Sequence, residues 1–247
     1  MLENWPRPAV IGHRGACALA PENTLASFTL ALQQDADAIE FDVKLTADDQ
    51  VVVMHDASVD RTTNGKGKVN GLALAEIKEL DAGAKFSSDF TGENVPMLSQ
   101  VFEQLGGKIL MNVELTNYSS PFDRLVPEVV KLVKEYQVQD HILFSSFLAG
   151  NLRQARRLLP EVPCGLLAYP GWMGYLARNY GWRKYQALHP FLNEVTPTLV
   201  EKVHLEGRRV HVWTVNEKSD FKRLLEAGVD GIFSDNPGSL RTLLVSQ

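Results

Sequence analysis

Short apolar runs rich in β-branched residues alternate with amphipathic segments along almost the whole chain, and this alternation constrains the fold most. The strand-like runs cover residues 9–13, 38–43, 109–114, 141–145, 164–168, 186–189, 209–214 and 231–234. Segments with apolar residues at helical spacing lie between them, for example at residues 24–33, 125–136, 148–158 and 219–226. Strands that alternate with helices are typical of a parallel sheet whose outer face is covered by helices.

The number of units and the chain length favour a closed barrel over an open sheet. About eight strand–helix units within 247 residues match a (β/α)8 TIM barrel. The first strand leads into Gly12-His13-Arg14-Gly15, which is not the GxGxxG motif of a dinucleotide-binding open sheet. We therefore predict an α/β protein with a (β/α)8 TIM barrel as a single domain over residues 1–247.

One segment interrupts this rhythm, between residues 46 and 97. It contains a short apolar run at residues 51–54, a helical stretch at residues 73–80 and the turn-rich Asn64-Gly65-Lys66-Gly67. Long irregular segments in compact domains are usually functional. We expect a small cap that is inserted after the second strand and lies over the mouth of the barrel.

Composition excludes several classes of protein. The chain has 25 Lys and Arg against 30 Asp and Glu, a formal charge of −5, which argues against nucleic-acid binding. Cys17 and Cys164 form no CxxC pair, so we expect free thiols in a reducing compartment. The sequence shows neither a signal peptide nor an apolar run of the ~18–20 residues that span a bilayer. We expect a soluble cytoplasmic protein without a membrane partner.

Three carboxylates lie at predicted strand ends, where TIM barrels carry their active sites. Glu40 and Asp42 are two residues apart on the second strand, so both face the barrel axis. Glu114 ends the next barrel strand. Three converging carboxylates need a cation to remain ionised, and oxygen ligands suit Mg²⁺, Ca²⁺ or Mn²⁺. The alternative is that Glu40 and Asp42 are solvated loop carboxylates.

Two histidines are candidates for acid–base work, because imidazole titrates near neutral pH. His13 ends the first strand, and His55 follows the run at residues 51–54. A structural role is the alternative for each of them. Four histidines remain, and His189, at the end of the sixth strand, is the one expected on the same face of the barrel. The other three are His141, His204 and His211.

Two further residues are candidates for substrate contact. The planar guanidinium of Arg14 matches a pair of phosphate oxygens, and a salt bridge to a nearby carboxylate is its alternative role. Trp213, near the end of the seventh strand, either provides an apolar wall for a small polyol or belongs to the core.

Together these motifs resemble the glycerophosphodiester phosphodiesterase family. The resemblance rests on Gly12-His13-Arg14-Gly15, Pro21-Glu22-Asn23-Thr24, Glu40-Phe41-Asp42-Val43, His55-Asp56, Asp60-Arg61-Thr62-Thr63-Asn64-Gly65, Val113-Glu114, Val212-Trp213-Thr214-Val215-Asn216 and Gly228-Val229-Asp230-Gly231-Ile232-Phe233-Ser234-Asp235. These elements occur in the family's order across nearly the whole chain. The compact length resembles that of the cytoplasmic bacterial members.

The resemblance implies a fold, a metal site and a reaction. The fold is a TIM barrel with a small inserted cap, and Arg14 contacts the phosphate. One divalent cation is held by Glu40, Asp42 and Glu114, and His13 and His55 form the acid–base pair. The substrates are glycerophosphodiesters, such as glycerophosphocholine, glycerophosphoethanolamine and glycerophosphoglycerol. The products are sn-glycerol 3-phosphate and an alcohol.

The implied mechanism uses the two histidines in turn. We expect His13 to take a proton from the glycerol 2-hydroxyl or from water, and His55 to protonate the departing alcohol. If the hydroxyl attacks, a cyclic phosphate forms, and water opens it with the roles reversed. The sequence leaves the assignment of the two roles open. Many members have Lys where this chain has Thr116, which removes a second cationic contact to the phosphate.

Three alternative functions compete with this hypothesis. A phosphodiester lyase would stop at the cyclic phosphate, and a non-catalytic barrel would only bind glycerophosphodiesters. An enolising barrel also gathers carboxylates at strand ends, but it needs a base that reaches a carbon acid. No lysine lies at a suitable predicted strand end for that role.

Overall fold

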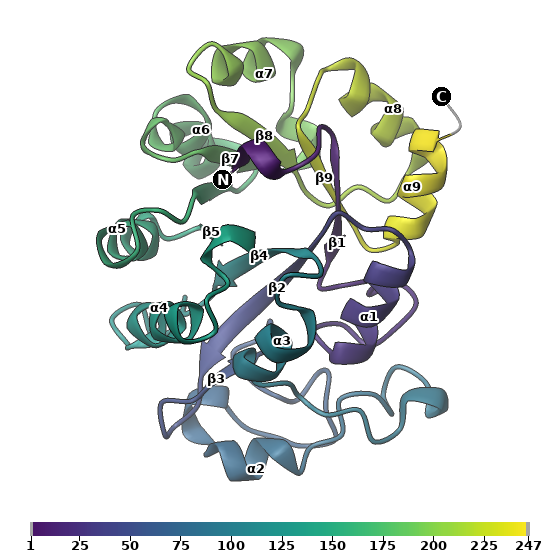
Figure 1. The fold of residues 1–247 in the computed structure, drawn as a ribbon, viewed down its shortest axis with the longest axis vertical. Helices are drawn as coiled ribbons and strands as arrows, with labels where there is room; N and C mark the ends of the chain where they lie inside the picture. Colours follow the sequence, from purple (N-terminus) through teal and green to yellow (C-terminus); the bar gives the residue numbers. More distant parts are fainter. Residues whose placement is uncertain (1, 246–247) are drawn as a thin grey trace.

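A computed structural model describes residues 2–245 of the chain. Eight parallel strands form a closed barrel, in which β1 pairs with both β2 and β9 (Figure 1). The barrel strands are β1 (Ala9–His13), β2 (Ala38–Leu45), β4 (Leu110–Leu115), β5 (Ile142–Ser146), β6 (Cys164–Ala168), β7 (Ala187–Pro190), β8 (Arg209–Val212) and β9 (Gly231–Ser234). The predicted TIM barrel is confirmed.

Helices surround the barrel (Figure 1). They are α1 (Leu25–Gln33), α3 (Leu98–Leu105), α4 (Leu125–Glu135), α5 (Ala149–Leu158), α6 (Gly171–Asn179), α7 (Pro197–His204), α8 (Lys218–Glu226) and α9 (Pro237–Val245). Short 3-10 helices are η1 (Leu2–Asn4), η4 (Gln139–His141), η5 (Gly181–Lys184) and η6 (Leu192–Glu194). Within the described chain, no helix has the length and apolar character needed to cross a membrane.

Successive side chains along each strand point alternately outward to the helices and inward to the barrel axis. Phe41 of β2 points outward and packs on Phe28 of α1, with ring centroids 5.4 Å apart. Its neighbours Glu40 and Asp42 point to the opposite face, as the spacing predicts, and line a pocket at the barrel's carboxyl end. The opposite end is filled by an apolar cluster that includes Trp5. Chemistry is therefore restricted to one end of a filled barrel.

The segment between residues 46 and 97 forms a small unit with its own core. Its strand β3 (Val51–Val53) runs antiparallel to the end of β2, and it contains η2 (Val69–Gly71), α2 (Leu74–Lys78) and η3 (Ser88–Phe90). Seven residues form its apolar cluster: Val52, Met54, Val59, Val69, Ile77, Ala82 and Val95.

The insertion does not lie over the mouth of the barrel as expected. Figure 1 shows it at one side, beyond α1 and α3. Its strand β3 pairs with residues 43–45 at the carboxyl end of β2. Residues 54–61 return to the barrel and bring His55 to the pocket.

Several boundaries differ from the predicted ones by a residue or two. β4, β5 and β7 each begin and end one residue later than expected. β8 ends at Val212, so Trp213 lies beyond the strand. His141 belongs to η4 and precedes β5.

Candidate active site

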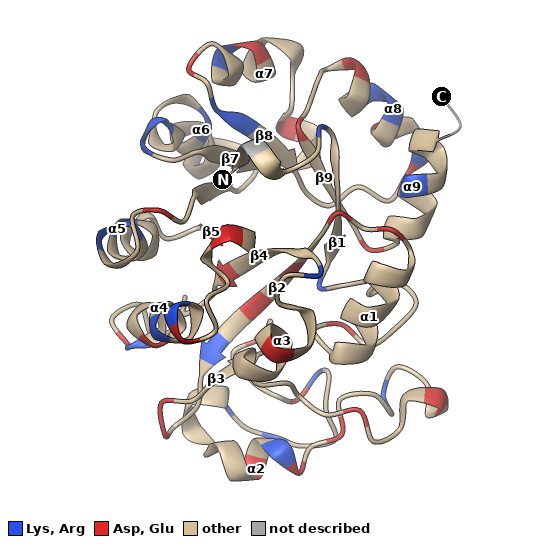
Figure 2. Ribbon diagram, in the orientation of Figure 1, with Lys and Arg blue, Asp and Glu red and all other residues tan. Residues whose placement is uncertain are grey.

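The three predicted carboxylates meet at the carboxyl end of β2 and β4. In the parallel pairing of β2 with β4, Asp42 lies opposite Glu114. Glu40 precedes Asp42 by two residues on β2, so its side chain is on the same face of the sheet. Each of the three contributes an oxygen that lies within 4.8 Å of the oxygens of the other two. Glu40 and Asp42 are buried and Glu114 is partly buried. Figure 2 shows acidic residues on β2 in the middle of the ring of helices.

The electrostatics of this group favour a bound cation. Burial, together with the charge of Asp42, raises the pKa of Glu40 well above its usual range and raises that of Glu114 to about 8. Tyr118 opposes the shift by donating a hydrogen bond of 2.7 Å to Glu114 Oε1. Oxygen donors that repel one another are the donor set of a hard divalent ion. The residues present therefore fit the expected metal.

Arg14 lies against these carboxylates. Its backbone N–H donates to Glu40 Oε2 at 3.0 Å, and its Nε is 3.5 Å from Asp42 Oδ2. Its Nη1 donates to Glu22 Oε1 at 2.8 Å. The guanidinium thus forms the carboxylate pairs that were one of its two expected roles. It also lines the pocket, so its predicted contact to a phosphate stays open.

A tight turn after β1 places Arg14. Arg14 and Gly15 both have positive φ, at 51° and 84°. Ser27 of α1 holds the turn, because its Oγ donates to the Arg14 carbonyl at 2.9 Å. A Cβ on Gly15 would come within 2.3 Å of this Oγ. Glycine is required here so that the turn can pack against α1.

Both predicted histidines line the same pocket, and each is held by a carboxylate. His13 Nδ1 is 2.6 Å from Asp235 Oδ1, and His55 Nδ1 is 2.6 Å from Asp56 Oδ1. A carboxylate partner favours the tautomer that carries its proton on Nδ1. The Nε2 atom of each ring is then the one that can exchange protons with a substrate.

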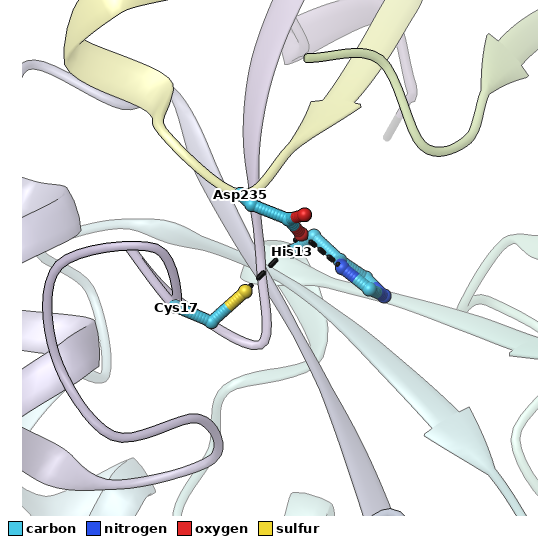
Figure 3. A group of neighbouring side chains, drawn as sticks. All are labelled: His13, Cys17 and Asp235. Carbon is cyan, nitrogen blue, oxygen red and sulfur yellow. Dashed lines mark hydrogen bonds and ion pairs between the residues drawn. The ribbon is translucent and has the colours of Figure 1, made fainter. Parts of the chain in front are cut away.

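Asp235, in the loop after β9, is the centre of a small network (Figure 3). Its Oδ1 accepts from His13 and from the Cys17 thiol, whose Sγ lies 3.1 Å away. Its Oδ2 accepts from Asn216 Nδ2 at 2.6 Å. Burial opposes ionisation, but these hydrogen bonds hold the pKa of Asp235 at about 2. Asp235 is therefore an anion that can orient His13.

The same network has the composition of a second metal site, because ligand atoms of His13, Cys17 and Asp235 lie within 4.8 Å of one another. A thiol must lose its proton to bind a metal. Burial and the charge of Asp235 raise the pKa of Cys17 far above neutrality. In this structure the thiol donates a hydrogen bond to Asp235, and the three side chains form a hydrogen-bond network.

Ion pairs join the insertion to the barrel. Arg61 donates to Glu22 through two bonds of 2.7 and 2.8 Å, and to Asp56 at 2.7 and 3.1 Å. Because Asp56 holds His55 and Glu22 holds Arg14, Arg61 couples the two halves of the site. Glu22, Asp56, Arg61 and Asp235 were not predicted as site residues. Each of the four lies within a motif that carries the family resemblance, and this position was the available signal.

The rest of the pocket is mostly apolar. Trp213 lines it together with Phe147, Leu167 and Phe233. Trp213 Nε1 donates to the His189 carbonyl at 2.8 Å, which fixes the indole. Trp213 therefore lies in the pocket wall and also packs on the apolar cluster of the barrel, and its contact to a polyol stays a prediction.

Asn112 of β4 offers the pocket a free acceptor. Its side chain is 1% exposed, and its Nδ2 donates to Ser145 Oγ at 2.9 Å. Among the residues that the structure describes, its Oδ1 has no hydrogen-bond partner.

His189 does not lie at the mouth of the barrel, where the sequence predicted it. It is fully buried inside the barrel and stacks on His211, with ring centroids 5.1 Å apart. The reason is that β7 continues to Pro190, and a further bridge joins Phe191 to Trp213. His189 thus lies one layer below the mouth and does not line the pocket. Substrate contact by His189 is not supported.

A lysine does stand beside Thr116, but it comes from another strand. Lys44 of β2 is buried and donates through Nζ to the Thr116 carbonyl and hydroxyl, at 2.7 and 3.0 Å. It does not line the pocket, so it adds positive charge behind Asp42 and makes no direct contact to a ligand there.

A barrel whose strand ends present clustered acids, an arginine and two carboxylate-bound histidines is an enzyme site suited to phosphate esters. The fold and site thus define a TIM-barrel phosphodiesterase. The model of the glycerophosphoryl diester phosphodiesterase family matches residues 13–239, and the chain belongs to this family.

Individual relatives are similar to this chain over nearly their whole length. A glycerophosphodiester phosphodiesterase of Caldanaerobacter subterraneus is 41% identical over 236 residues, covering 95% of this chain and 97% of the relative. A solved phosphodiesterase of Oleispira antarctica, in complex with the product sn-glycerol-3-phosphate, has a TM-score of 0.86 and 32% identity, with 97% of each chain covered. A glycerophosphodiester phosphodiesterase of Agrobacterium tumefaciens has a TM-score of 0.80 and 30% identity, covering 94% and 98%.

Proposed function

We propose that this chain hydrolyses glycerophosphodiesters to sn-glycerol 3-phosphate and an alcohol, and that Glu40, Asp42 and Glu114 hold one divalent cation. The observation that carries the proposal is the buried group of three carboxylates between Arg14 and two carboxylate-bound histidines. The sn-glycerol-3-phosphate complex of the Oleispira antarctica relative supports this substrate class. Glycerophosphocholine, glycerophosphoethanolamine and glycerophosphoglycerol are the proposed substrates, and Mg²⁺, Ca²⁺ or Mn²⁺ the proposed cations.

Two groups neutralise the negative charge of the phosphodiester: the bound cation and Arg14. A divalent cation bound by the carboxylates supplies Lewis-acid stabilisation of the phosphate charge. Arg14 presents the remaining positive charge at the pocket, and Glu22 and Asp42 hold its side chain in place before the substrate arrives. Preorganised charge of this kind stabilises a transition state without further rearrangement.

Proton transfer falls to the two histidines. His13 takes the proton of the attacking oxygen at Nε2, and Asp235 stabilises the imidazolium that results. His55, held by Asp56, protonates the oxygen of the departing alcohol. If the glycerol 2-hydroxyl attacks first, the same two rings exchange roles when water opens the cyclic phosphate.

Two further side chains orient the glycerol. The indole of Trp213 provides an apolar wall for its carbons. The free Oδ1 of Asn112 can accept a hydrogen bond from a glycerol hydroxyl, which would satisfy a buried acceptor that otherwise lacks a partner.

The variant His55→Ala tests the acid–base assignment. Removing a general acid costs at least ~10²-fold in kcat, while the carboxylates that hold the cation are untouched. We therefore expect glycerophosphocholine turnover to fall by that factor, with cation affinity unchanged by calorimetry. His141→Ala, a histidine of η4 away from the pocket, is the matched control. Near-normal turnover in His55→Ala would contradict the assignment.

A further inference from the structure

Three side chains with different donor atoms meet at the Nδ1 side of His13. Ligand atoms of His13, Cys17 and Asp235 all lie within 4.8 Å of one another (Figure 3). Asp235 Oδ1 is 2.6 Å from His13 Nδ1 and 3.1 Å from Cys17 Sγ. A nitrogen, a sulfur and an oxygen donor together form a ligand set of the kind that binds Zn²⁺.

The loops that carry these donors are fixed by the fold. His13 ends β1, and Cys17 lies in the turn that follows it. The backbone N–H of Ala18 donates to the Asp235 carbonyl at 2.9 Å, which joins the loop after β1 to the loop after β9. Asn216 holds the carboxylate of Asp235 by donating from Nδ2 to Oδ2 at 2.6 Å. A carboxylate that is oriented by such an outer hydrogen bond is typical of protein metal sites.

A tetrahedral zinc ion requires little movement of these donors. At zinc–ligand distances of ~2.0–2.3 Å, neighbouring ligand atoms lie about 3.3–3.7 Å apart. The Asp235 oxygen must therefore move away from Nδ1 and from Sγ by roughly 1 Å or less. The side chains of His13 and Asp235 are 22% and 29% exposed and Cys17 is partly buried, so an ion can reach them from solvent.

The proton of Cys17 does not prevent metal binding. Burial and the charge of Asp235 raise the pKa of the thiol. A divalent cation between the two groups offsets the charge of Asp235, and a thiol that coordinates such an ion is deprotonated. Binding therefore releases the thiol proton to water and forms a metal–sulfur bond.

This donor set differs from that of the three carboxylates of the proposed catalytic metal site. Those carboxylates offer oxygen alone, which suits hard cations such as Mg²⁺. Cys17 adds sulfur and His13 adds nitrogen, and a thiolate selects Zn²⁺ over hard cations. Cys17 and Asp235 also do not line the catalytic pocket. The two groups are therefore separate sites that prefer different ions.

We propose that His13, Cys17 and Asp235 form an inhibitory Zn²⁺ site, which stops catalysis by occupying Nδ1 of His13. The inhibition rests on the proposed function, because it uses the role of His13 as a base. An imidazole that binds a metal through Nδ1 carries its proton on Nε2. In that form Nε2 has no lone pair to accept the proton of the attacking oxygen. The ion also separates Asp235 from His13, so the anion no longer stabilises an imidazolium.

Cadmium absorbance tests the site without an assay of activity. Cd²⁺ reports thiolate ligands, because its bond to sulfur gives a charge-transfer band in the ultraviolet. We expect the wild type to show this band and Cys17→Ser to lack it, since the serine hydroxyl keeps a donor for Asp235 but removes the sulfur. Cys164→Ser, a change at the buried thiol of β6, is the matched control and should keep the band. A missing band in the wild type, or a band that persists in Cys17→Ser, would overturn the inference.

Zinc inhibition of glycerophosphocholine hydrolysis tests the effect on catalysis. Assays contain a saturating concentration of the cation that supports turnover, and each variant is compared with its own zinc-free rate. We expect the Zn²⁺ concentration for half inhibition to be at least ~10-fold higher in Cys17→Ser than in the wild type and in Cys164→Ser, because loss of even an outer partner of a metal site costs that much affinity. More of the supporting cation should leave the wild-type value unchanged, because the two sites are separate.

The contradicting outcomes are distinct from failure of the proposed function. Equal half-inhibition in the wild type and Cys17→Ser, or relief of inhibition by more supporting cation, would place zinc at the three carboxylates and overturn the inference. Full activity of the zinc-treated wild type would overturn it as well. Absence of turnover with every cation would refute the proposed function, and the cadmium band would then decide whether the metal site exists.

Discussion

At the residue scale, the side chains that line the pocket are held in place by charged partners, some of which do not line it themselves. Asp235 does not line the pocket, yet it holds the histidine that does. Arg61 likewise joins Glu22 to Asp56, and these two acids hold Arg14 and His55. The reacting groups are therefore oriented by partners that come from different loops.

Asp235→Asn tests this orienting role. An amide keeps the shape of the side chain but cannot stabilise an imidazolium, so we expect kcat/KM to fall at least ~10-fold. The loss should fall on kcat rather than on KM, because the imidazolium forms only as the proton is transferred. Steady-state assays with glycerophosphocholine at fixed pH measure both constants.

Cys17→Ala is the matched control for this variant. It removes a second hydrogen bond to the same carboxylate oxygen but leaves the anion beside His13. Its kcat and KM should coincide with those of the wild type. An unchanged kcat in Asp235→Asn would show that Asp235 has only a structural role.

The sequence predicted the residues that line the pocket better than the residues that hold them in place. Glu40, Asp42 and His13 could be found because alternation along a strand and the position of a strand end are local properties. Asp235 and Arg61 act through loops whose paths depend on the whole fold, so no local pattern indicates their contacts.

At the element scale, the register between β2 and β4 creates the proposed metal site. Asp42 pairs with Glu114, and the next same-face pair joins Glu40 to Asn112. The barrel, its strands and the inward direction of Glu40 and Asp42 could be predicted from periodicity. The register could not, because it depends on side-chain packing between strands that are far apart in the sequence.

His189 and the insertion show where prediction by element failed. Placing His189 at the mouth assumed that the sixth barrel strand ends with it, but the strand pairing extends beyond His189. The insertion lies at one side of the barrel and not over its mouth, and its strand β3 is hydrogen-bonded to the end of β2. In both cases tertiary hydrogen bonds set the geometry, and the amino-acid pattern does not reveal them.

At the scale of the whole molecule, the chain carries a net negative charge but places positive side chains at and near the pocket. The formal charge is −5, yet Arg14 lines the pocket and Arg61 and Lys44 lie close behind it. Arg14 lies beside Asp42, one of the carboxylates proposed to be offset by a cation, and Arg61 pairs with Glu22 and Asp56. A negative overall charge is thus compatible with a phosphodiester substrate.

The barrel interior should make stability depend on pH. Burial lowers the pKa of His189 to about 3. Burial also lowers the pKa of His211 well below its usual value, and the neighbouring His189, Arg209 and Arg7 add to this shift. The unfolded chain therefore binds more protons below pH ~6.5, so stability falls as pH falls. From pH 7 to 5 the His189 ring should therefore lower the free energy of unfolding by about 2 kcal/mol.

Urea denaturation of His189→Leu at pH 7 and pH 5 measures this contribution. The loss of stability between the two pH values should be about 2 kcal/mol smaller than in the wild type. His141→Gln, a change outside the barrel interior, should keep the wild-type difference. An equal difference in His189→Leu would mean that the native ring is not held neutral.

The dependence of glycerophosphocholine hydrolysis on added cation tests the central claim most directly. Metal-stripped protein is assayed with Mg²⁺, Ca²⁺ or Mn²⁺, and the product is identified by phosphorus NMR. We predict no turnover in chelator, recovery with at least one of these ions, and sn-glycerol 3-phosphate as the final product. Glu114→Gln should need at least ~10-fold more cation. Full turnover of the stripped protein in chelator, or a cyclic phosphate as the final product, would contradict the account.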